Sequence, residues 1–339
     1  MDRVRQIADA VLYEGYILWP YRRSTLKNQQ RWTFGGVYPE AWSRARDGDD
    51  PWTMQTQCLV EGSPDTRLDL TVRFLHVVER QPMREVEGGA KPVDELRVGD
   101  ERHLAWQEAT ERELMLGDRP LGRLGAGLRG EIEVEDGRAQ EAIHDPAGRR
   151  AGSVARSWRA LRGAVVVRAD EAGPGLYRVS VRVENTTPWA GESRERVLEQ
   201  TLCSCHTVLR ARGGSFVSMT DPPESMRSAA EACQSSGTWP VLVGEEGDRS
   251  TMLSSPIILP DYPQVAPESP GDLFDATEID QMLVLNILAL TDEERREMRD
   301  ADPRAREILE RTESLTEEEL MRLHGAIREL NVVRGRGSG

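Results

Sequence analysis

One short segment of the chain concentrates side chains that bind transition metals. Cys203, Cys205 and His206 stand within four consecutive residues, and thiolates and imidazoles are the usual ligands of zinc and related ions. If residues 197–209 form a strand, its alternation places Cys203 and Cys205 on one side, with Cα atoms roughly 6.6 Å apart, and His206 on the other. If the segment is instead a helix, its apolar stripe consists of Leu198, Leu202, Cys205 and Leu209.

A complete metal site needs more ligands than this segment supplies. Three or four protein ligands are normal, so the others have to come from elsewhere, where the candidates are Cys58, Cys233, His76, His103 and His144. Two interpretations of the cluster stay open. Either Cys203, Cys205 and His206 hold a transition metal or serve redox chemistry, or the thiols are buried and pack as small hydrophobic side chains.

No catalytic signature accompanies this cluster. The sequence contains no GxGxxG run after a predicted strand, no P-loop, no GxSxG elbow and no HExxH motif. A pair of carboxylates is the usual machinery of glycoside hydrolysis, but the 58 acidic residues offer too many pairs for the sequence to select one. A β-sandwich enzyme or binding module for a carbohydrate-like ligand is therefore an alternative hypothesis without assigned residues.

Aromatic residues gather near the start of the chain and predict a surface for a partner protein. Of 18 aromatic residues, nine lie within residues 1–52, and cationic residues stand between them. Mixtures of aromatic rings and arginine form the centres of protein interfaces. The expected partner-binding residues are Tyr16, Trp19, Tyr21, Trp32 and Phe34, with Arg22 and Arg23 at the rim. Alternatively, the rings fill core and anchor the segment on a sheet, or they stack on single-stranded nucleic acid.

Charge and hydropathy argue against several classes of function. The net charge of −14 over 339 residues makes nucleic acid an unfavourable main partner. No apolar run approaches the roughly 18–20 residues of a membrane-spanning helix, since the longest candidate, residues 282–290, is broken by Asn286. The first ten residues contain no apolar core of a secretion signal. We therefore expect a cytoplasmic protein with reduced cysteines and no membrane span.

Composition divides the chain into regions that must position these residues. We expect an aromatic-rich N-terminal segment packed on the body (1–52), a β-rich domain (53–265), an acidic helical module (272–331) and a flexible tail (332–339). Short strands separated by turn residues favour an antiparallel β-sandwich or open-barrel body. The predicted fold class is therefore α+β, with the helices at the C-terminal end.

Local periodicity supports individual elements within these regions. Residues 67–79 and 177–184 alternate between polar and apolar types, as half-buried strands do. The pair Asp136 and Gly137 is a hairpin signal. Residues 2–14 have the spacing of a helix, whose apolar face consists of Val4, Ile7, Ala8, Val11 and Leu12.

The acidic C-terminal region has the pattern of amphipathic helices. Thr291 with Glu294, and Thr316 with Glu319, fit the capping box that begins a helix. The region also carries more than half of the net negative charge of the chain. It is either a solvated helical cap on the body or a docking module for a basic partner.

Two segments together resemble a known family. They are VLYEGYILWPYRRSTLKNQQRWTFGGVYP at residues 11–39 and LFDATEIDQMLVLNILALTDEERREMRDADPRAREILERTESL at residues 273–315. They are similar to an uncharacterised bacterial protein family, of actinobacterial type, that is associated with [NiFe]-hydrogenase gene clusters. The resemblance implies a non-catalytic accessory role in hydrogenase assembly, stability or maturation. Hydrogenase subunits or maturation factors would then be the partners, and the resemblance assigns no catalytic residue.

Overall fold

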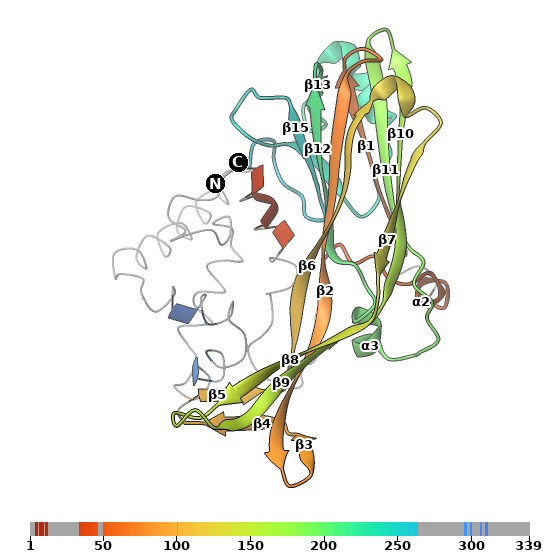
Figure 1. The fold of residues 1–339 in the computed structure, drawn as a ribbon. Coiled ribbons are helices and arrows are strands. Elements are labelled where there is room, and N and C mark those ends of the chain that lie inside the picture. Colours follow the sequence, from red (N-terminus) through yellow and green to blue (C-terminus); the bar gives the residue numbers. More distant parts are fainter. Residues whose placement is uncertain are drawn as a thin grey trace, which may run out of the picture. The chain divides into compact units, whose positions relative to one another are not determined.

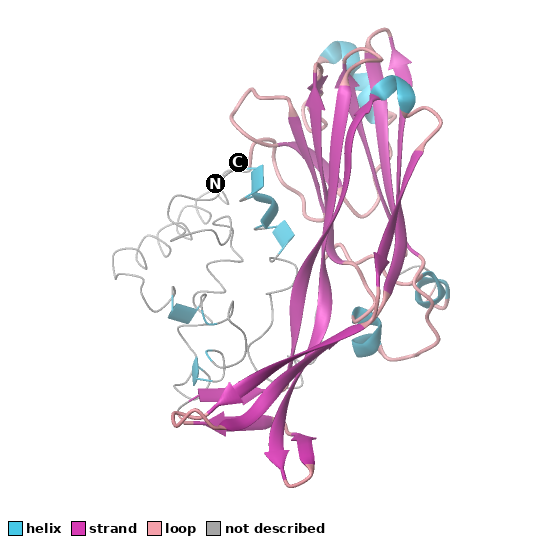
Figure 2. Ribbon diagram, viewed as in Figure 1, coloured by secondary structure: helices cyan, strands magenta, loops and turns pink. Residues whose placement is uncertain are grey.

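Antiparallel β-strands make up most of this computed structural model (Figures 1 and 2). The structure describes residues 4–5, 7–9, 11–12, 34–46, 50–99, 101–263, 295–296, 299, 306 and 309–310. The chain divides into two units, Met1–Trp19 with Leu26–Pro263, and Pro20–Thr25 with Gln264–Gly339. The first unit contains every strand of the described residues.

The smaller of the two main sheets has five strands. Their spatial order is β13 (Ser215–Phe216), β1 (Thr53–Glu61), β11 (Leu176–Asn185), β10 (Leu161–Gly173) and β7 (Leu128–Val134). All of these strands pair antiparallel. The strand predicted at residues 177–184 is therefore confirmed, because β11 shows the strict alternation of buried and half-buried side chains that its sequence indicated.

The larger sheet contains the longest strand of the described chain. Its order is β14 (Trp239–Leu242), β15 (Thr251–Ser255), β12 (Cys203–Arg212), β2 (Arg67–Val86), β9 (Arg150–Trp158) and β8 (Gly137–His144). Two further strands pair with β2, namely β6 (Trp106–Pro120) and β3 (Gly89–Pro92). A separate hairpin is formed by β4 (Glu95–Val98) and β5 (Glu101–Leu104).

Helices within residues 34–263 are short. They are α2 (Glu40–Arg44), α3 (Arg194–Leu198) and α4 (Arg227–Glu231), with 3₁₀ turns η2 (Leu121–Arg123) and η3 (Glu224–Met226). No helix among the described residues is long and apolar enough to cross a membrane.

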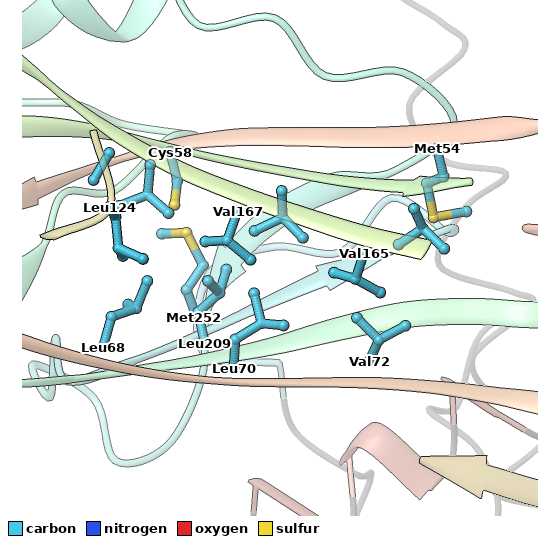
Figure 3. Packing of buried hydrophobic residues seen from close by; sticks show 14 of the residues in the cluster. Met54, Cys58, Leu68, Leu70, Val72, Leu124, Val165, Val167, Leu209 and Met252 are labelled. Atoms are coloured by element: carbon cyan, nitrogen blue, oxygen red, sulfur yellow. The ribbon is translucent and has the colours of Figure 1, made fainter. Parts of the chain in front are cut away.

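The two sheets pack face to face around one hydrophobic core (Figure 3). Alternate residues of β2, such as Leu70 and Val72, point into this core and face Val165 and Val167 of β10. Each of these side chains is at most 2% exposed. Burial of apolar surface at about 25 cal/mol per Å² stabilises the two layers against each other, and the body is an open β-sandwich as predicted.

β2 is long enough to belong to two parts of the first unit. Residues 67–75 pair with β12, residues 79–84 pair with β9 on the same edge, and β6 follows the opposite edge. At about 3.3 Å per residue its 20 residues extend over roughly 66 Å. β2 therefore continues beyond the sandwich into an extension, which we call the β arm. The arm consists of the end of β2, the start of β6, and β3, β4, β5, β8 and β9 (Figure 1).

The β arm has its own small core and its own ion pairs. Leu96, Ile143 and Val154 form a buried cluster there. On the strands, Glu108 contacts Arg80 at 3.2 Å and Arg156 at 2.7 Å. These two pairs link β6, β2 and β9, and networks of this kind hold strands more firmly than isolated surface pairs.

The described residues of the N-terminal helix cover the outer face of the larger sheet. All seven of them are helical, and the predicted apolar face is buried at Val4, Ile7, Ala8, Val11 and Leu12. The first four of these pack against Val241, Val243 and Leu253. Amphipathic spacing therefore predicted both the helix and its buried side.

The helical part of the predicted α+β class lies mostly outside the described residues. Within 272–331 only residues 295–296, 299, 306 and 309–310 are described, and all of them are helical. Most of the predicted aromatic segment and the whole predicted tail, 332–339, also lie outside the described residues. What the structure shows of the fold is therefore the mostly antiparallel body.

Candidate functional site

The segment that contains Cys203, Cys205 and His206 is neither a uniform strand nor a helix. Helix α3 ends at Leu198, and β12 begins at Cys203. The pairing with β2 then shifts between Cys203 and His206. Ser204, within this shift, has a left-handed φ of 49°. The segment is a β-bulge, which inserts an extra residue and breaks the simple alternation of side chains.

The bulge separates the two thiols. Cys203 packs with Leu75 and Val197 on the outer side of the larger sheet, whereas Cys205 lies in the sandwich core with Leu209. The expectation that both thiols share one side of a regular strand is therefore wrong. It assumed strict alternation, which the bulge interrupts.

Burial makes these side chains poor nucleophiles. Burial first, and the Cys203 thiol second, raise the pKa of Cys205 to about 12. Burial lowers the pKa of His206 to about 3, and its Nδ1 lies 3.1 Å from the carbonyl oxygen of Ser204. Within the described part of the chain, no group of three or more His, Cys, Asp or Glu side chains could hold a metal ion. The metal role of Cys203, Cys205 and His206 stays a prediction.

The predicted partner-binding surface is described at only one of its residues. Phe34 is 45% exposed, and it lies one residue before Gly35, whose carbonyl accepts a hydrogen bond from the backbone of Cys205. Tyr16, Trp19, Tyr21, Arg22, Arg23 and Trp32 lie outside the described residues.

β2 changes its neighbour in the middle of the larger sheet, and a polar pocket lies at this change. Pairing with β12 ends at Leu75, and pairing with β9 begins at Glu79. The strand that follows β9, β10, belongs to the other sheet. A cavity of about 580 Å³ is lined there by residues of β2, β6, β8, β9 and α3 and by Asp136, Arg159 and Glu199. We call it the partner-change pocket, because β2 changes its partner strand there from β12 to β9.

One row of side chains across four strands lines this pocket. Gln107, Glu79, Ser157 and Arg138 are direct neighbours on β6, β2, β9 and β8, and all four line the cavity. Residues directly opposite each other on neighbouring strands point to the same face of a sheet. The Gln107 amide donates a hydrogen bond to the Glu79 carboxylate. The row thus presents an amide, a carboxylate, a hydroxyl and a guanidinium side by side.

Helix α3 supplies a second wall. The residue before the helix, Ser193, caps it, because its hydroxyl accepts a hydrogen bond from the backbone N–H of Arg196. Val197 and Leu198 are buried beneath it and fix its position. Arg196 and Glu199 line the cavity. Because Val197 and Leu198 anchor the helix, they also fix the positions of the Arg196 and Glu199 charges.

Trp158 also lines the pocket. Its indole Nε1 donates a hydrogen bond to the carbonyl oxygen of Glu135 at 3.1 Å. Its ring lies so close to Gly137 that a Cβ atom at that position would come within 2.4 Å of a ring carbon. Only glycine leaves room for the indole there, so a larger residue at position 137 must displace it.

The pKa of one carboxylate in this pocket, that of Glu199, is shifted. Burial raises the pKa of Glu199, and the negative charge of Glu79 adds to that rise. Arg159 lies 3.4 Å from the Glu199 carboxylate and opposes the shift. Groups whose ionisation is disfavoured by burial and by a like charge are common in binding and active sites.

A buried histidine lies on β2 between the residues that pair with β12 and those that pair with β9. His76 follows the last β2 residue paired with β12 and is fully buried. Burial first, and the positive charge of Arg112 second, lower its pKa to about 4, while the backbone carbonyls of Glu199 and Arg159 oppose this shift. Neither ring nitrogen makes a well-directed hydrogen bond with them. The imidazole is therefore neutral at pH 7, and two residues whose carbonyls lie near it, Glu199 and Arg159, also line the pocket.

A second polar cluster connects the N-terminal helical residues to the sheet. The Arg73 side chain is 4% exposed and lies 2.6 Å from Asp9, 2.9 Å from Glu113 and 3.1 Å from Glu111. It borders a smaller cavity of about 440 Å³. A buried guanidinium is tolerated only when several acceptors surround it, and here one acceptor belongs to the helix. This cluster is an anchor for that helix.

The sequence did not reveal the partner-change pocket. Its row of four polar residues is spread from Glu79 to Ser157, and only the strand register brings the four together. The signal that existed was weak, since polar residues at positions 79, 107 and 138 are ordinary for exposed strand faces.

Comparison with known proteins adds no family to this description. The sequence matches no protein-family model and no curated protein. The function therefore has to be argued from the site and the surface themselves.

Proposed function

We propose that this chain is a non-catalytic accessory protein that works by holding a partner protein, and that the partner is a subunit or maturation factor of a [NiFe]-hydrogenase. The partner's identity rests on the resemblance of residues 11–39 and 273–315. The mode of action rests on the β arm. One observation at the end of that arm carries the proposal.

The tip of the β arm presents two like charges directly opposite each other. Arg84 of β2 faces Lys91 of β3 in the register of their hairpin, and both residues are exposed. Like charges in this arrangement destabilise a strand pair. Among the described residues neither cation forms an ion pair. An acidic segment of a partner, bound at the tip, would neutralise both.

The overall charge of the protein and the small core of the arm both favour binding at Arg84 and Lys91. The hairpin also carries Glu85 and Glu87, and Glu85 is held by Arg150 at 2.7 Å. On a protein with a net charge of −14, the adjacent cations Arg84 and Lys91 would orient an approaching acidic segment. The small core of the arm at Leu96, Ile143 and Val154 keeps the hairpin in place before binding. A surface that is already ordered loses less entropy when the complex forms.

Two parts outside the described residues belong to the same proposal. Further contacts to the partner would come from the aromatic residues Tyr16, Trp19, Tyr21, Trp32 and the exposed Phe34, with Arg22 and Arg23. The acidic helical module at 272–331 would dock a basic region of a partner. The test below removes the aromatic residues separately from the arm tip.

Affinity capture from the native host tests the proposal. The tagged full-length protein should retain a hydrogenase subunit or maturation factor. The double variant Arg84→Glu with Lys91→Glu should capture at least about tenfold less of that partner than the wild type does. The reason is that an attraction worth about 1.4 kcal/mol is removed. Arg119→Glu with Arg123→Glu is the matched control, since both arginines are exposed and lie outside the arm.

Two results would contradict different parts of the proposal. Capture of reproducible partners that include no hydrogenase-related protein would overturn the identity of the partner. Equal capture by the wild type, the arm variant and the control would overturn the role of the arm. In that case the double variant Trp19→Ala with Trp32→Ala decides whether the aromatic surface holds the partner instead.

A further inference from the structure

We infer that the partner-change pocket binds a neutral, polyhydroxylated ligand of the kind that a mono- or disaccharide presents. This site is independent of the proposed protein contacts, because it uses residues of the sheet face and α3 rather than the arm tip. The cavity, at about 580 Å³, lies within the range of about 300–1,000 Å³ typical of small-molecule sites.

The row of four side chains matches the chemistry of vicinal hydroxyl groups. Glu79 offers only acceptors, Arg138 offers only donors, and Gln107 and Ser157 offer both. A hydroxyl group donates and accepts at once, so a ligand with several hydroxyls can satisfy every member of the row. The strand spacing of about 4.8 Å sets these groups apart by a distance that neighbouring ring substituents can bridge.

The charges of the pocket favour a neutral ligand over an ionic one. Four carboxylates and three guanidinium groups line the cavity. Arg159 already forms an ion pair with Glu199. Opposite charges are interspersed on two walls, so a phosphate group would meet carboxylates and a polyamine would meet guanidinium groups. Neither kind of ion would find a region of one sign.

The carboxylates of Glu79 and Glu199 favour a ligand whose hydroxyl groups donate hydrogen bonds. Glu199 has a side chain only 15% exposed, and the negative charge of Glu79 disfavours its ionised form. A hydroxyl that donates to Glu199 compensates this carboxylate for the hydration it has lost. The nearby indole of Trp158 adds an apolar side, against which the carbon-bound hydrogens of a sugar ring can pack.

Saturation-transfer NMR and calorimetry on the full-length protein provide the test. The probes are methyl glucoside, maltose and cellobiose, with glucose 6-phosphate and spermidine as ionic competitors. At least one neutral sugar should bind with a dissociation constant near or below about 1 mM, which corresponds to about −4 kcal/mol. The two ionic compounds should bind more weakly than the sugar.

Matched variants locate the binding. Trp158→Ala and Glu199→Gln should each weaken the sugar at least about tenfold. Gly137→Val should do so as well, because its side chain displaces the indole. Glu141→Gln is the control, since Glu141 lies on β8 with a side chain that is 70% exposed and does not line the cavity. The Glu141→Gln variant should bind the sugar with the affinity of the wild type. Far-ultraviolet circular dichroism checks that each variant folds.

Three results would overturn the inference. They are the absence of binding by all three neutral sugars, a preference for glucose 6-phosphate or spermidine, and sugar binding that Glu199→Gln leaves unchanged in a folded protein. Because Glu199→Gln replaces one side chain by another of equal size, loss of the fold is not expected to obscure the outcome. None of these results bears on capture by the arm tip, so the two proposals can fail separately.

Discussion

Ser204 shows how one strained residue decides the geometry of the cysteine segment. Its φ of 49° is a left-handed conformation that costs a non-glycine residue about 1 kcal/mol, and its buried hydroxyl makes no hydrogen bond. Ser204→Ala removes the hydroxyl and keeps the strain, whereas Ser204→Gly removes both. We expect the glycine variant to be more stable than the alanine variant by about 1 kcal/mol in urea unfolding. Equal stabilities would show that the bulge is unstrained.

The burial of the thiols leads to a prediction about their reactivity. Burial raises the pKa of Cys58 and of Cys205, and alkylation requires the thiolate. Burial also raises the pKa of Cys233, although Arg178 opposes this shift. Because this thiol is partly exposed, iodoacetamide at pH 8 should label it first. Cys58, Cys203 and Cys205 should react only after denaturation. Rapid labelling of Cys203 or Cys205 in the native protein would contradict the buried position and revive the redox interpretation.

The metal hypothesis can be tested on the same residues. Elemental analysis of protein purified without oxygen should find a transition metal in the wild type and less of it in Cys203→Ser, if the cluster is a metal site. Cys233→Ser is the control, because Cys233 belongs to a different apolar cluster. Equal metal content in all three proteins would leave the thiols as core residues.

At the scale of elements, sequence patterns succeeded where a segment has one environment. β11 has one buried face along its whole length, and its alternation is therefore visible in the sequence. β2 begins in the same way at residues 67–79, but its continuation to Val86 includes Pro82 and several polar residues. Proline is rare in strands. The β arm follows from pairing between distant strands, which local composition does not contain.

The attachment of the N-terminal helix to the larger sheet should depend on its ion pair with Arg73. Arg73 contacts Asp9 at 2.6 Å, so Asp9→Asn removes a link between the helix and the sheet. Hydrogen exchange at residues 4–12 should become faster, while exchange in β11 should stay unchanged. Arg73→Met should lower the unfolding free energy by about 1 kcal/mol, since it leaves three partly exposed carboxylates without their shared partner. Unchanged exchange in Asp9→Asn would show that apolar contacts alone hold the helix.

At the scale of the whole molecule, the candidate sites differ in how far the sequence could indicate them. The aromatic residues and the cysteine segment are contiguous, so composition pointed to them. The partner-change pocket requires the register of four strands, and its wall requires α3, a helix too short for periodicity to reveal. The bulge at Ser204 also escaped prediction, because serine is an ordinary strand residue with no preference for a positive φ.

The stability of the whole protein should depend on pH through its buried histidines. The pKa of His76 falls from 6.5 to about 4, and that of His206 from 6.5 to about 3. Between pH 6.5 and these folded values the unfolded chain binds protons that the native protein does not. Acidification therefore favours unfolding, by about 1.4 kcal/mol per pH unit for each fully titrating histidine. Urea unfolding between pH 5 and 6.5 measures this loss.

The contribution of one histidine can be isolated. His206→Gln should reduce the pH dependence by about half in this range, because one of two shifted groups is gone. The raised pKa of Glu199 acts in the opposite direction, since the native protein gains a proton before the unfolded chain does, so Glu199→Gln should steepen the loss on acidification. Stability that stays constant from pH 6.5 to 5 in the wild type would show that the two imidazoles are accessible to protons in the native state.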